Sequence, residues 1–154
     1  MIYRTMSFAF AVSLAWGFAT PAWSEDTPSN MSRGVADPLA GPRTAIANGS
    51  WVQAVTLLEE ARRSGVDSAD LHNLLGYSLR KKSPPDLDRA LTHYRLALER
   101  EPAHRGALEY MGEAYLMLRR PDEARRLLDT LQKVCGGTAC EEYVELRQAI
   151  EDYR

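Results

Sequence analysis

The feature of this sequence that most restricts its fold is a pattern of residues that recurs in register along the chain. The pairs Leu75-Gly76 and Met111-Gly112 lie 36 residues apart, and a large apolar residue follows each glycine at the third position. A second pattern, an alanine with apolar or aromatic residues four and seven positions later, recurs at intervals of 36 and 34 residues, starting at Ala54, Ala90 and Ala124. Self-similarity at such a period predicts a stack of repeated supersecondary units, each burying its apolar face against the next.

Between these patterns the apolar residues keep a helical spacing that Gly, Pro or Asp interrupts at short intervals. Ser50-Trp51-Val52-Gln53 has the spacing of a capping box, which predicts a helix that begins at the tryptophan. Pro102 predicts the start of a helix that runs to Leu118, and Pro121 the start of the next one. No segment alternates as a half-buried strand would. We therefore expect an all-α chain of seven short helices, over 43–47, from 51, from 67 or 68 to 82, from 86 to 98, 102–118, from 121 to the glycines at 136, and 141–153.

The recurring residues resemble the tetratricopeptide repeat, whose period is 34 and whose pattern runs W-x2-L-G-x2-Y, then A-x3-F, then Pro. The resemblance extends over about 43–131, and His72 and Leu108 stand where the family has tryptophan. The residues that carry it are Leu75, Gly76, Ala90, Tyr94, Pro102, Met111, Gly112, Tyr115, Ala124 and Leu128. It implies a short α-solenoid of helix-turn-helix repeats, ended by a C-terminal capping helix.

The sequence divides into four parts. We expect a signal peptide at 1–24, a flexible lead-in at 25–40, helical repeats at 41–134 (about 41–66, 67–102 and 103–134), and a cysteine loop with the capping helix at 135–154.

The first part has the composition of a cleavable secretory signal. It holds one charge, Arg4, an apolar run from Met6 to Thr20, and small residues at Ala22 and Ser24, where a signal peptidase reads. The alternative is a transmembrane anchor, but the run is short for a span, which needs about 20 residues. We expect cleavage, a periplasmic location and no membrane insertion afterwards.

The charge balance argues against nucleic acid as a partner. Without the leader, 18 basic and 21 acidic side chains remain, whereas nucleic-acid-binding domains usually carry a basic excess.

Cys135 and Cys140 are the only cysteines, and four residues separate them. In an oxidising compartment we expect them to form a structural disulfide. The alternative is a redox-active pair, which usually has two intervening residues and lies at a helix N-terminus.

No constellation of catalytic residues is recognisable, so we expect no enzyme activity, no cofactor and no metal. The histidines, His72, His93 and His104, fall in different predicted segments without ligand spacing, and we interpret them as surface or packing residues.

The resemblance also implies a function. In similar proteins the first helices of successive hairpins line a concave groove that receives a peptide or helix of a partner. The corresponding positions here are Asn73, Tyr77, Arg80, Glu109, Glu113 and Leu116, unless they are merely solvent-exposed. We expect a non-catalytic scaffold, an assembly or maturation factor that binds another envelope protein, with a homo-oligomer also conceivable. The alternatives are a thiol-disulfide or metal-handling protein that uses the two cysteines, and an enzyme subunit tethered by an uncleaved leader.

Overall fold

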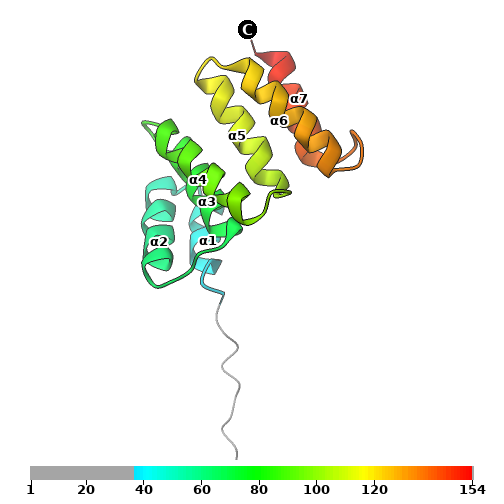
Figure 1. The fold of residues 1–154 in the computed structure, drawn as a ribbon. Helices are drawn as coiled ribbons and strands as arrows, with labels where there is room; N and C mark the ends of the chain where they lie inside the picture. Colours follow the sequence, from blue (N-terminus) through cyan, green and yellow to red (C-terminus); the bar gives the residue numbers. More distant parts are fainter. Residues whose placement is uncertain (1–36, 154) are drawn as a thin grey trace, which may run out of the picture. The chain divides into compact units, whose positions relative to one another are not determined.

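The computed structural model describes residues 37–153 of the chain. The expected signal peptide at 1–24 and the lead-in up to residue 36 lie outside the described residues. Seven helices follow one another, with no strand among the described residues (Figure 1). Their bounds are α1 (Ala40–Ala47), α2 (Trp51–Arg63), α3 (Ala69–Lys81), α4 (Leu87–Arg100), α5 (Arg105–Met117), α6 (Pro121–Val134) and α7 (Glu141–Asp152). The all-α prediction is confirmed.

Successive helices pack in pairs, because the connections between them are short. The pairs α1–α2, α3–α4 and α5–α6 are hairpins, and α7 packs against both α5 and α6. Each hairpin exposes an apolar face that it cannot cover alone, so the next hairpin covers it.

Four helices end in the same way, with the residue after the C-cap in the left-handed region. At three of these ends the residue is glycine, Gly49, Gly65 or Gly136, and at the end of α5 it is Arg119, with a φ of 60°. At each end two backbone N–H groups donate back to carbonyls of the last turn, the pattern of a Schellman motif.

The expected capping box at Ser50 and the expected start of α5 at Pro102 are both wrong, although α2 begins at Trp51 as predicted. Ser50 precedes α2, but its hydroxyl makes no capping hydrogen bond. Helix α5 begins at Arg105 instead of Pro102, because the ring Nδ1 of His104 accepts the N–H of Ala107 at 3.1 Å and caps the helix there. Pro102 is left exposed in the preceding turn.

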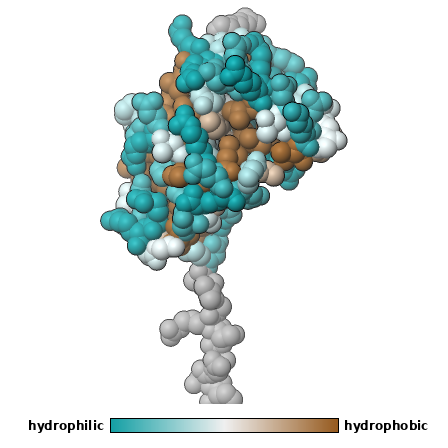
Figure 2. Space-filling model, viewed as in Figure 1, coloured by the Kyte–Doolittle hydropathy of each residue, from teal (hydrophilic) through white to brown (hydrophobic). Residues whose placement is uncertain are grey.

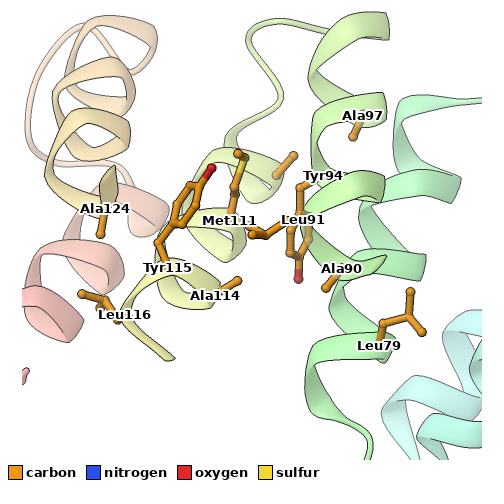
Figure 3. Packing of buried hydrophobic residues seen from close by; sticks show 11 residues of the cluster. Leu79, Ala90, Leu91, Tyr94, Ala97, Met111, Ala114, Tyr115, Leu116 and Ala124 are labelled. Atoms are coloured by element: carbon orange, nitrogen blue, oxygen red, sulfur yellow. The ribbon is translucent and has the colours of Figure 1, made fainter. Parts of the chain in front are cut away.

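The largest core cluster joins the two central hairpins. Figure 3 shows Leu91 of α4 and Met111 of α5 pointing into the space between these helices, with Tyr94 beside them. A smaller cluster lies between α2 and α3, and a third holds α7 against α5 and α6 around Leu146. The core is therefore continuous along the stack.

Two glycines of the recurring pattern allow close packing. A Cβ atom on Gly76 would lie 2.6 Å from the ring of Tyr94, and one on Gly112 would lie 2.5 Å from Leu146. Both contacts are shorter than real side chains permit, so only glycine lets α3 approach α4 and α5 approach α7 to this distance.

The surface is mainly hydrophilic at its edges. Figure 2 shows apolar surface gathered in the middle of the displayed face. Met117 of α5 is 47% exposed. Of the helices within residues 37–153, none has the length and apolar character that a membrane crossing requires.

Candidate functional site

The direction in which the stack curves identifies its inner face. Helices α3, α5 and α7 contact one another in series, whereas within the described residues no contact of comparable extent joins α2 with α4 or α4 with α6. Helices approach one another on the inner side of a curved stack and diverge on the outer side. The inner face is therefore the one that α3, α5 and α7 share.

Three half-buried aromatic side chains form a continuous row across the repeats, which we call the aromatic row. Trp51 of α2 meets the Tyr77 ring edge-on, with centroids 5.6 Å apart, and Tyr77 of α3 meets Tyr110 of α5 at 4.7 Å. Each ring belongs to a different hairpin, so a ligand lying on the row would contact all three. Large rigid rings with a polar edge are the side chains that dominate the energetics of protein interfaces.

Arg80 fixes the middle of this row. Its guanidinium lies 5.4 Å from the Tyr77 centroid and 5.5 Å from the Tyr110 centroid, and it forms an ion pair with Glu113 of α5. It is only 9% exposed, and its Nε has no hydrogen-bond partner among the described residues. Arg80 therefore acts as a cross-link between α3 and α5 under the rings.

Carboxylates surround Tyr110 at one end of the row. Glu109 of α5 is 3% exposed, because α7 covers it. Burial first, and the adjoining carboxyl group of Glu145 second, raise the pKa of Glu109 to about 9. Burial and then the charge of Glu109 raise the pKa of Tyr110 to about 12. Glu109 is thus a neutral acid at neutral pH, held in a region of excess negative charge.

The other end of the row is positively charged. The Nζ of Lys81 lies 5.8 Å from the Trp51 centroid. Next to it is an open hollow of about 440 Å³, lined by Gly49, Ser50, Trp51, Val52, Gln53, Lys82 and Ser83. Val52 in this hollow is 67% exposed.

The structure brings the six predicted groove residues together on α3 and α5, but it buries most of them. Tyr77 and Glu113 are half-buried, while Asn73, Arg80, Glu109 and Leu116 are each less than a tenth exposed. The prediction that these residues contact a partner stays a prediction. Within this set, Tyr77 and Glu113 are the side chains that a partner can reach without rearrangement. The sequence pattern did not reveal the contributions of Trp51 and Tyr110.

The recurring pattern itself is a set of core residues. Leu75, Ala90, Tyr94 and Ala124 are fully buried, and Met111 and Tyr115 are nearly so. Leu128 is half-buried and Pro102 is exposed in a turn.

His72 and His93 form a buried pair that sequence reasoning missed. Their Nδ1 atoms lie 3.0 Å apart, with the two ring planes inclined at 21°, and His72 Nε2 lies 2.9 Å from Asp67. An Nδ1–H···Nδ1 bond requires one ring to donate and the other to accept, so both cannot be charged. Burial and then the adjacent His72 lower the pKa of His93 to about 4. The two rings come from different helices, so only their contact in the fold reveals the pair.

Cys135 and Cys140 form the expected disulfide, with their Cα atoms 6.0 Å apart. Cys140 is the N-cap of α7, a position that favours a reactive thiolate, but Glu141 and Glu142 in the first turn oppose that effect with negative charge. In the described part of the chain, the group with a possible metal-binding arrangement is Cys135, Cys140 and Glu142, whose two sulfur atoms are bonded to each other. The bridge joins the end of α6 to the start of α7.

Residues 86–134, which span α4, α5 and α6, match a protein family described as tetratricopeptide repeat. No curated protein matches the chain.

Proposed function

We propose that this protein is a non-catalytic scaffold that binds a peptide or helix of another envelope protein on its inner face. The match of residues 86–134 to the tetratricopeptide repeat family supports this proposal. Repeats of this family typically serve protein–protein interaction. The observation that carries the proposal is the aromatic row, Trp51, Tyr77 and Tyr110, which links three hairpins on one surface.

The size of the row indicates how such a complex is built. A stack this short offers a contact area at or below about 1,000 Å², the lower end for a stable complex. Binding energy then concentrates in a few large side chains, for which the half-buried tyrosines are the natural anchors. The bound partner remains exchangeable, as suits an assembly or maturation factor.

The test is partner capture with one ring removed. The tagged protein is expressed in its native envelope and purified, and co-purifying proteins are identified by mass. We expect a reproducible partner that Tyr77→Ala reduces at least tenfold. The matched control is Tyr143→Ala, which removes a half-buried ring from α7, outside the row. Capture that survives Tyr77→Ala, or is lost equally in both variants, would overturn the assignment of the inner face.

We propose further that the protein acts in the periplasm after cleavage behind Ser24. The apolar run and the small residues at 22 and 24 support this. N-terminal sequencing of the protein from the soluble periplasmic fraction should begin at Glu25. A sequence that begins at Met1 in the membrane fraction would favour an anchored protein instead.

A further inference from the structure

The aromatic row is electrically polarised, and this property restricts the chemistry of its ligand. Positive charge gathers at the Trp51 end and negative charge at the Tyr110 end. Arg80 in the middle is neutralised by Glu113. The charge of the surface thus changes sign along the row.

The acidic end has more negative charge than its own cations compensate. Four carboxyl groups lie around it, on Glu109, Glu113, Glu142 and Glu145. Arg80 pairs with Glu113, and Arg105 approaches Glu142 at 3.6 Å. Within residues 37–153 no cation pairs with the other two, and Glu109 retains a proton instead. Glu145 is therefore left without a partner cation among the described residues.

An unpartnered acceptor lies beside this end. Asn73 is 8% exposed, and its Oδ1 has no hydrogen-bond donor among the described residues. The amide group of Asn73 and the ring of Tyr110 both lie beside Gly106. A Cβ atom added to Gly106 would lie 3.3 Å from the amide nitrogen of Asn73 and 3.7 Å from the Tyr110 ring. A second, independent observation therefore indicates that a donor group is missing here.

The basic end has complementary properties. Lys81 is exposed at the last turn of α3, and it forms no ion pair within the described part of the chain. The adjoining hollow at Trp51 combines an exposed apolar side chain, Val52, with Lys82 and hydroxyl groups. It has room for a side chain of the ligand.

We propose that the aromatic row binds an extended peptide segment of mixed charge. Its acidic residues lie at Lys81 and Trp51, an apolar or aromatic side chain lies on Tyr77, and an arginine or lysine lies among the carboxylates at Tyr110. This inference rests on the proposed function and specifies the partner's chemistry. Complementary charges also fix which way the segment lies and reject partners of uniform charge.

Selection from a displayed library of random peptides tests the proposal on the mature protein. We expect the enriched peptides to carry Asp or Glu at one end, an apolar centre, and Arg or Lys at the other. Tyr77→Ala should abolish the enrichment.

Two charge reversals then examine each end with one selected peptide, by fluorescence anisotropy. Glu145→Lys should weaken binding about tenfold through the basic end of the peptide, and Lys81→Glu about tenfold through its acidic end. The matched controls are Glu151→Lys on the same helix as Glu145, and Lys133→Glu, which like Lys81 is exposed in the last turn of its helix. Both should bind like the unmodified protein, and added salt should weaken binding in all.

The possible failures are distinguishable. Peptides of a single charge, or equal loss in the reversal variants and their controls, would overturn the polarity while leaving the scaffold function intact, provided that Tyr77→Ala still abolishes binding. Peptides that bind regardless of Tyr77, or no enrichment at all, would overturn both.

Discussion

The buried histidine pair connects the acid stability of the protein to one hydrogen bond. Asp67 holds His72 from the α2–α3 loop, and burial first and then His72 hold the pKa of His93 at about 4. The other charged groups around His93 are Glu59 and Arg62 of α2 and Arg89 of α4. The unfolded chain binds the proton at about pH 6.5, so acid favours unfolding.

We therefore predict that the free energy of unfolding has its full value above pH 6.5. It should decrease by about 2–3 kcal/mol as the pH falls toward 4. Urea denaturation at a series of pH values measures this loss. His93→Gln should flatten the dependence between these values, whereas His104→Gln, at a residue outside the pair, should keep it. An unchanged slope in His93→Gln would exclude the pair as its cause.

The raised pKa of Glu109 predicts that the stability of the protein also depends on pH in the alkaline range. Burial and Glu145 raise its pKa to about 9, so the folded state holds a proton that the unfolded chain releases near its ordinary pKa of 4.5. The contribution of protonated Glu109 to the free energy of unfolding is therefore complete below pH 4.5 and is lost as the pH rises through 9. Glu109→Gln keeps the shape and cannot ionise, so it should be more stable than the unmodified protein at pH 9, by on the order of 2 kcal/mol. At pH 5 the two should be nearly equal, as thermal unfolding can show.

At the scale of the helix, Arg119 occupies a position that glycine occupies at the other three Schellman ends. A side chain there costs about 1–2 kcal/mol, offset in part by the entropy that glycine loses on folding. Arg119→Gly should therefore raise the free energy of unfolding by about 0.5–1 kcal/mol. The opposite change, Gly136→Ala, introduces a Cβ that meets no neighbour within 4 Å. The decrease in the free energy of unfolding that it causes therefore measures the cost of the left-handed backbone conformation alone. Denaturation midpoints that shift in the same direction for both variants would contradict this account.

Most helix positions follow from local signals in the sequence. Glycines in left-handed turns and Pro121 at the first turn of α6 mark boundaries that the structure confirms. The start of α5 was misplaced because both Pro102 and His104 can precede a helix, and local chemistry alone does not rank them.

The candidate site was less predictable, since it depends on contacts between helices. The recurring pattern located Tyr77 but implied exposure for Glu109, which α7 buries. It also assigned no role to Trp51, since that ring joins the row from α2. Spacing in a sequence reports which residues share a helix face, whereas a neighbouring helix decides which of them remain accessible.

At the scale of the molecule, the Cys135–Cys140 bridge fastens the last helix to the array. A loop this small constrains the unfolded chain by about 2 kcal/mol, so Cys135→Ser combined with Cys140→Ser should lower the free energy of unfolding by about that amount. Dithiothreitol should lower the stability of the unmodified protein equally and leave the double variant unaffected. Partner capture should persist in the double variant if the bridge is structural, whereas its loss with the fold intact would favour a thiol function.

The two ends of the stack are secured differently. Helix α1 packs on α2, whereas α7 packs on α5 and α6 and is covalently tied to the end of α6. Opening of the native protein should therefore be directional, with backbone amides of α1 exchanging their hydrogens for deuterium first and those of α5 to α7 last. Exchange that begins in α7 with the bridge intact would contradict this order. The stack then unfolds progressively from its N-terminal end. A bound segment that reaches Trp51 would slow the opening of that end.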